Sequence, residues 1–142
     1  MTKDVLVTIA GLQFEIDSEE PIEVITAGQY FLKNDKHYVL YDEILEDTNE
    51  ICKNRIKIGK EQVEILKTGA SNVHMVFEKG KKNLTYYNTP FGNLLIGIDT
   101  TKVEFNEGSE QLELKINYVL EVNYAHVSDC SITIKVTSKK TP

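Results

Sequence analysis

One stretch of strict alternation constrains the fold of this 142-residue chain more than any other feature. From Leu112 to Val122 every second residue is apolar, and most residues between them are charged or amides. Cys130, Ile132, Ile134 and Val136 repeat the pattern against polar neighbours. Successive side chains of a β-strand point to opposite faces, so a period of two predicts strands with one dry and one wet face.

Turn-forming residues divide the rest of the chain into short segments of strand character. The opening segment changes phase at Ala10 and Gly11, which predicts a β-bulge there. Residues 60–67 are the best helix candidate, although alternation favours a strand, and residues 42–50 have room for one helical turn. We expect strands over residues 4–16, 21–33, 36–45, 53–58, 62–68, 72–78, 83–88, 93–105, 111–123 and 127–138.

Short connections without crossover helices predict that consecutive strands pair antiparallel, as in a meander. An open meander leaves two unpaired edges, and closure removes them. We therefore predict an all-β fold, a single closed antiparallel up-and-down barrel of about 8–10 strands, occupying residues 1–142 as one domain. An immunoglobulin-like sandwich is the alternative, but such domains usually carry a core tryptophan and this chain has none.

Charge and hydropathy narrow the classes of function. The net charge is −6 and the pI about 5.1, which argues against binding to nucleic acids or anionic membranes. The chain has no apolar run of about 18 residues that would span a bilayer, and its first residues do not resemble a signal peptide. With two cysteines far apart in sequence, we expect a reduced, cytoplasmic protein.

Four segments carry a family resemblance: HYVLYDE at 37–43, LKTGA at 66–70, MVF at 75–77 and YNTPFG at 87–92. Their order and spacing resemble the YwiB-like family of uncharacterised bacterial proteins, catalogued as a domain of unknown function. The resemblance covers nearly the whole chain and implies a lipocalin-like (calycin) β-barrel, with no catalytic residues to carry over. Unlike true lipocalins, the chain has no tryptophan, and its single arginine is Arg55.

Seven tyrosines suggest a ligand-binding interior, because they would give a barrel lumen an apolar wall with a few hydroxyl donors. In the alternative interpretation they are core residues whose hydroxyls reach solvent. Phe91, in the turn that follows Thr89, would either cap the lumen or only help to fix the hairpin register. The candidate ligand-binding residues are Tyr41, Tyr86, Tyr118, Met75 and Phe91.

Arg55 would bind a ligand carboxylate if it faced a barrel mouth, but it alternates with Ile56 and is predicted on the outer surface. Of the three histidines, His37, His74 and His126, the last has other possible metal ligands close in sequence. The spacing of His126, Asp129 and Cys130 matches no established zinc pattern, so we expect no metal site and no other cofactor. The cluster of His126, Asp129 and Cys130 is more typical of a strand that begins a core stripe. Cys52 is expected as a free thiol in the acidic connection.

The sequence contains no phosphate loop, dinucleotide fingerprint, nucleophile elbow or Cys-x-x-Cys. We therefore expect a non-catalytic protein, and rank binding of a small hydrophobic or amphipathic molecule first. The alternative is an interaction or structural module with a packed barrel, acting through its surface or as a homodimer. An enzyme ranks third, and would need polar groups that converge in one cavity.

Overall fold

The computed structural model describes residues 2–12, 22–44, 49–69, 72–89 and 92–139, and every regular element in them is a β-strand. These residues contain no helix long and apolar enough to cross a membrane. The strands are β1 (Asp4–Leu12), β2 (Ile22–Lys33), β3 (Lys36–Ile44), β4 (Ile51–Ile58), β5 (Val63–Gly69), β6 (Val73–Phe77), β7 (Lys82–Thr89), β8 (Gly92–Glu107), β9 (Gln111–Val122) and β10 (Ala125–Ser138).

The ten strands form one antiparallel sheet in the order β6-β5-β4-β3-β2-β1-β10-β9-β8-β7. Pairing of β1 with β10 joins the two ends of the chain, as a closed meander requires. The predicted all-β meander barrel is therefore confirmed, with one interruption. The sheet ends at β6 and β7, which are consecutive in sequence but share no strand ladder. We call this interruption the seam.

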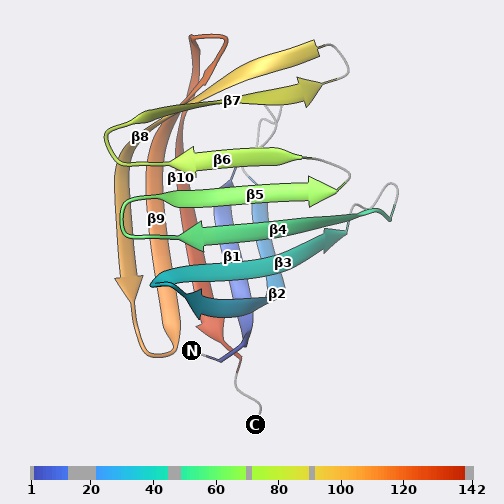
Figure 1. Cartoon of the computed structure of the whole chain (residues 1–142), viewed down its shortest axis with the longest axis vertical. Coiled ribbons are helices and arrows are strands. Elements are labelled where there is room, and N and C mark those ends of the chain that lie inside the picture. Colours follow the sequence, from blue (N-terminus) through green and yellow to red (C-terminus); the bar gives the residue numbers. More distant parts are fainter. Residues whose placement is uncertain (1, 13–21, 45–48, 70–71, 90–91, 140–142) are drawn as a thin grey trace.

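The barrel is flattened into two layers. Figure 1 shows β3 to β6 and the last part of β2 crossing the front of the molecule, while β1, the first part of β2, β9, β10 and much of β8 run behind them almost at right angles. Such orthogonal packing needs bent strands, and bulges supply the bends. The register shifts between Ala10 and Leu12, where Gly11 has a φ of 85°, which confirms the predicted bulge. A second shift, between Thr100 and Lys102, interrupts the pairing of β8 with β9.

The core lies between the two layers and is built from the inward-facing residue of each alternating pair. Its fully buried side chains are mainly aliphatic, and each contributes roughly 1.5–3 kcal/mol through removal from water. Tyr118 and Phe77 are the largest of them, with ring centroids 5.1 Å apart in an edge-to-face arrangement. Other members are Val5, Val7, Ile9, Val39, Ile56, Ile65, Ile98, Leu112, Leu114, Ile116, Ile132, Ile134 and Val136.

Two details of the predicted elements are resolved by the structure. Alternation correctly favoured a strand within residues 60–67, because β5 begins at Val63. The prediction for Cys52 was wrong: it lies within β4 rather than in the acidic connection, and its side chain is fully buried. Cys52 faces the core because it has the same parity as Ile56. Neither Cys52 nor Cys130 forms a disulfide.

Candidate functional site

A recess of about 390 Å³ opens at the end of the barrel where the β4–β5 hairpin, the β6–β7 turn and β8 meet. We call it the seam recess, because β6 and the turn beside the seam form one of its walls. Its volume lies within the usual range for small-molecule sites. The apolar residues that line it are Ile58, Val63, Phe77, Val103, Phe105 and Leu114.

The floor of the seam recess is the hydrophobic core itself. Ile58, Phe77 and Leu114 are among the fully buried core residues, and alternation directs all three side chains inward. Phe105 lies opposite Leu114 in the β8–β9 ladder, yet 37% of its surface is exposed. An exposed aromatic side chain thus lies over the buried core at this end, which is a property of a site that receives apolar groups.

The rim of the recess is rich in lysine. Lys60 lies in the β4–β5 hairpin, and Lys79 and Lys81 lie in the β6–β7 turn. Glu61 and Glu78 share this rim, and Lys81 Nζ is 3.3 Å from a Glu78 carboxylate oxygen. Three ammonium groups against two carboxylates give the rim a small positive excess on a chain whose net charge is negative. Such a rim favours an anionic group on a bound molecule.

A hydrogen-bonded chain adjoins the recess through Phe105, whose ring centroid is 5.3 Å from that of His37. The Tyr30 hydroxyl lies 2.6 Å from His37 Nδ1, and His37 Nε2 lies 3.1 Å from a Glu107 carboxylate oxygen. Burial raises the pKa of Tyr30 above its ordinary value, and the charge of Glu107 raises it further. The hydroxyl therefore keeps its proton, and both contacts are satisfied when the Tyr30 O–H donates a hydrogen bond to Nδ1 and Nε2–H donates one to Glu107.

This chain holds the barrel end together rather than presenting reactive groups. Both nitrogens of His37 already have partners, so the ring has none left for a substrate. It links the β2–β3 hairpin to the end of β8. A second cavity, of about 560 Å³, borders Tyr30 and Glu107 on the side of Lys3 and Phe31. The Lys3 ammonium lies 5.6 Å from the centroid of the Phe31 ring, so an aromatic ring already covers one side of this charge.

A second group of polar side chains faces inward at the other end of these strands, near the end of β3, the start of β4 and the end of β5. Lys67 Nζ lies 2.6 Å from a Glu43 carboxylate oxygen, and the Lys67 side chain is only 10% exposed. Tyr41 and Asn54 are buried beside this pair in register. Burial raises the pKa of Tyr41 well above its ordinary value, and the charge of Glu43 raises it further. Lys67 and Glu43 neutralise each other's charge, so this group does not require a charged ligand.

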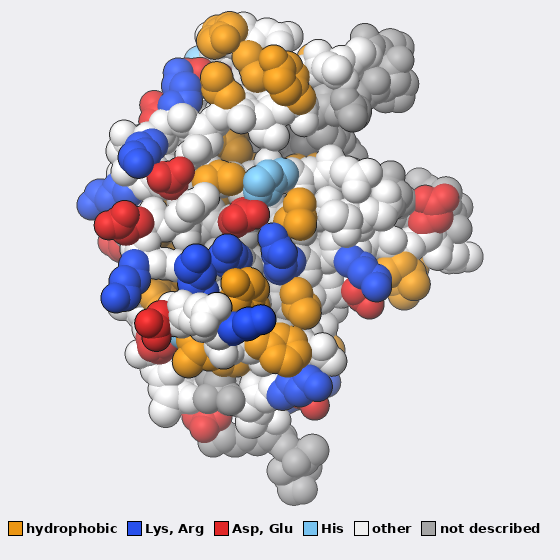
Figure 2. Space-filling model, in the orientation of Figure 1, with side chains coloured by type: hydrophobic (Ala, Val, Ile, Leu, Met, Phe, Trp, Pro, Cys, Tyr) orange, Lys and Arg blue, Asp and Glu red, His pale blue; other side chains and the backbone are white. Residues whose placement is uncertain are grey.

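The outer face of β2 to β5 carries a hollow of about 650 Å³, larger than the seam recess. Blue, red and orange side chains are interspersed over the face that Figure 2 shows. The hollow is lined by Asp4 and Asp42 as well as by Lys53 and Arg55, so a charged ligand of either sign would meet a like charge. We regard it as a furrow of the outer sheet surface and prefer the smaller recess, which opens onto the core.

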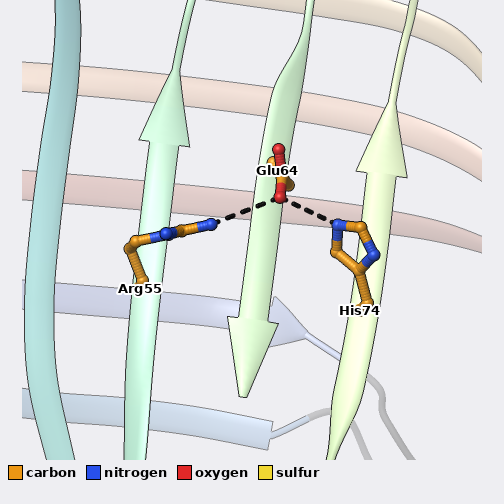
Figure 3. Close-up of polar contacts among 3 residues, drawn as sticks. All are labelled: Arg55, Glu64 and His74. Carbon is orange, nitrogen blue, oxygen red and sulfur yellow. Dashed lines mark hydrogen bonds and ion pairs between the residues drawn. The ribbon is translucent and has the colours of Figure 1, made fainter. Parts of the chain in front are cut away.

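Arg55 is half-buried on this outer face, as alternation predicted. Figure 3 shows Glu64 of β5 between Arg55 of β4 and His74 of β6. One Glu64 carboxylate oxygen lies 3.3 Å from Arg55 Nη2 and 2.9 Å from His74 Nε2. The carboxylate ties three adjacent strands together, and it leaves the guanidinium engaged within the protein rather than turned to a barrel mouth.

The predicted ligand residues are dispersed. Tyr41, Tyr118 and Met75 point inward and belong to the core cluster. Tyr86 does not line the interior, because 73% of its surface is exposed. Its partner in the β8 ladder is Leu95, which points outward because the next residue, Ile96, points inward. Phe91 lies outside the described residues. Among the predicted residues, Tyr118 contacts a residue that lines the seam recess, Phe77.

The other residues considered from sequence lie apart from the recess. His126 Nε2 pairs with an Asp129 carboxylate oxygen at 3.1 Å on the exposed surface. Cys130 packs against the core, and its Sγ lies 3.2 Å from Ser128 Oγ. Within the described ranges, no group of three histidine, cysteine or acidic side chains is placed to hold a metal ion.

Sequence reasoning missed most of the recess. Val103 and Phe105 lie opposite the core residues Ile116 and Leu114 only because the bulge after Thr100 shifts the inward parity of β8. The three rim lysines lie in turns that alternation does not place. A signal was present nevertheless: apolar Val103 and Phe105 resume the period of two after the polar break at residues 99–102.

These observations define the class of protein as an antiparallel β-barrel whose core opens at one end. The family model "Domain of unknown function (DUF1934)" matches residues 7–134, and the chain belongs to this family. A similar protein is the "Uncharacterized beta-barrel protein YwiB" of Bacillus subtilis (strain 168), 26% identical over 118 residues, which are 82% of each chain.

The solved structure of the ywiB protein from Bacillus subtilis has a similar fold. It superimposes with a TM-score of 0.73 at 22% identity, covering 96% of this chain and 91% of the other. This similarity establishes the shared barrel architecture.

Proposed function

We propose that this protein binds a small amphipathic molecule in the seam recess, with an apolar body against the core and an anionic head at the rim lysines. The observation that carries the proposal is an apolar recess over the core at one end of the barrel, with the Phe105 ring exposed in it beneath a lysine-rich rim. Binding there would remove apolar surface from water and bring an anion close to Lys79 and Lys81.

The seam supports the proposal further. β6 and β7 are not connected by a ladder, so the wall of the recess on that side lacks the hydrogen bonds that hold other neighbouring strands. Regions with fewer shared hydrogen bonds open at lower free-energy cost than the rest of a fold. A ligand longer than the recess could thus extend inward past Phe77 without disrupting a strand pair.

Titration with three twelve-carbon probes tests the proposal: dodecanoate, dodecanol and dodecyltrimethylammonium, each below its micelle concentration. We expect dodecanoate to bind most tightly, because the apolar tail is common and only the anion complements the rim. Exposed ion pairs contribute roughly 0.2–1 kcal/mol each, so reversing two lysines (K79E/K81E) should weaken dodecanoate binding about 3–10-fold. The matched control K33E/K139E reverses two exposed lysines that lie outside the recess.

A filling variant tests the apolar part. Val103→Phe adds volume at the recess wall and should abolish binding of dodecanoate and dodecanol alike, while Leu84→Phe adds the same kind of bulk on the exposed outer face of β7. If V103F and wild type bind dodecanoate equally, the recess is not the site. Equal binding of all three probes would leave the rim lysines without a role.

A second candidate function, association between copies of the chain, is favoured by one patch. Leu84 and Tyr86 of β7 are exposed, and so is Tyr124 in the β9–β10 turn. Asn123 brings that turn against β8, because its N–H donates to the Leu95 carbonyl. Figure 2 shows orange side chains gathered over this end of the molecule. Sedimentation velocity of wild type and of Y86S/Y124S tests the association: a concentration-dependent dimer that the variant lacks supports it, and a monomer at high concentration refutes it.

A further inference from the structure

Two buried polar atoms lie inside the barrel behind the seam without partners. Thr100 is completely buried, and its Oγ1 has no hydrogen-bond partner among the described residues. The side-chain nitrogen of Asn83, Nδ2, is likewise shielded from solvent and has no hydrogen-bond partner among the described residues. Buried polar atoms nearly always have a partner, and one that the chain does not supply must come from water or a ligand.

The strand register makes these two residues diagonal neighbours. Asn83 of β7 lies opposite Ile98 of β8, and Thr100 is the next inward-facing residue along β8. In the other direction Thr100 lies opposite Tyr118 of β9. The two orphan groups are therefore diagonal neighbours on the inner surface, within reach of a single small group between them.

The seam recess lies next to this pair. The Gly80 N–H donates to the Thr100 carbonyl at 2.9 Å, and the Thr100 N–H donates to the Lys81 carbonyl at 3.2 Å. Thr100 is thus anchored to the same turn that supplies two rim lysines. From the inner side, Tyr118 contacts Phe77, which is part of the recess wall. The Tyr118 ring and the β6–β7 turn thus connect Thr100 to residues that line the recess.

We propose that Asn83 and Thr100 form an inner anchoring site for an uncharged oxygen, a hydroxyl or carbonyl, at the far end of the ligand bound in the seam recess. The inference rests on the proposed function, because it specifies the inner half of that ligand. The Asn83 amide donates to the oxygen, and the Thr100 hydroxyl donates to it or accepts from it. Neither group is charged, so a neutral oxygen is matched without burying an unpaired ion. The ligand class is an amphipathic acid with a hydroxyl or oxo group distant from its carboxylate.

Calorimetric titration of unbranched acids of eight to twelve carbons against their ω-hydroxy counterparts tests this site. The range of lengths is needed so that one hydroxyl falls at the depth of Thr100. We expect at least one ω-hydroxy acid to bind wild type about fivefold more tightly than its parent, the effect of one good hydrogen bond. Thr100→Val and Asn83→Leu should remove the preference and leave the parent acid within twofold. Thr101→Val, an exposed neighbour, should retain it.

The outcomes separate the two proposals. If parent acids bind but no ω-hydroxy acid is preferred at any length, the inner site is overturned and the orphan atoms hold ordered water only. A preference that persists in both T100V and N83L overturns it as well. If no acid binds at any length, the proposed function itself fails, and the inner site with it.

Discussion

Replacing Thr100 by valine should make the ligand-free protein more stable, which is unusual for a change in a core. The side chain is fully buried and its Oγ1 has no partner among the described residues. A buried hydroxyl in that state costs about 1–3 kcal/mol relative to one that is satisfied. Valine has nearly the same shape, so it leaves no cavity to offset the gain. We expect T100V to raise the free energy of unfolding by about 1–2 kcal/mol.

The measurement is urea denaturation of ligand-stripped protein, followed by near-ultraviolet circular dichroism because the chain has no tryptophan. A gain of that size corresponds to a rise of roughly 3–6 °C in Tm for a domain of this length. Thr101→Val is the control: the Thr101 hydroxyl donates to the Asn117 carbonyl at 3.2 Å, so its loss should be neutral or destabilising by up to about 1 kcal/mol. A loss of 1 kcal/mol or more in T100V would refute the reasoning, because it would show that the hydroxyl already has a partner.

Three further changes have defined outcomes. Gly11→Ala should destabilise the protein by about 3 kcal/mol or more, since a Cβ would overlap a backbone oxygen of β10. Gly80→Ala is the control: Gly80 also has a positive φ but faces open space, so the change should cost about 1 kcal/mol, and thermal denaturation measures both. Folding raises the pKa of Tyr41, so the free energy of unfolding keeps the full contribution of the neutral hydroxyl below the unfolded pKa of 10.0 and loses it as the pH rises above that value. Between pH 8 and 11 the free energy of unfolding should therefore decline less in Tyr41→Phe than in wild type. Glu43→Gln should cost about 1–3 kcal/mol by leaving the buried Lys67 ammonium poorly compensated, and a second change, Lys67→Met, should recover part of that loss in a double-mutant cycle.

The architecture could be predicted from the sequence because alternation is a local signal. In β9 and β10 the buried residues are those that the period of two marks, and the phase change at Ala10 corresponds to the bulge at Gly11. The seam could not be predicted. Whether β6 pairs with β7 depends on the curvature accumulated over all ten strands, and no residue in either strand records it. Closure is complete between β1 and β10 but not there.

The candidate site was harder to predict than the fold for a related reason. Tyrosine content indicates that hydroxyls are available, but only the register shows that Tyr86 faces outward and Tyr118 inward. The recess draws on two turns and on β8 beyond its bulge, segments that are distant in sequence. In the sequence, Lys79 and Lys81 are indistinguishable from the lysines of an ordinary hairpin turn. Only the structure shows that this turn lines the same recess as Phe77.

The central claim is that the open end of the core beside the seam is the binding site. Titration of isotope-labelled protein with dodecanoate, followed through backbone amide chemical shifts, tests it most directly. The account predicts that the largest shifts fall in residues 58–63, 77–81 and 103–105, which surround the recess. Shifts concentrated instead in residues 27–29 and 53–55, along the outer hollow, or no saturable shifts at all, would contradict it.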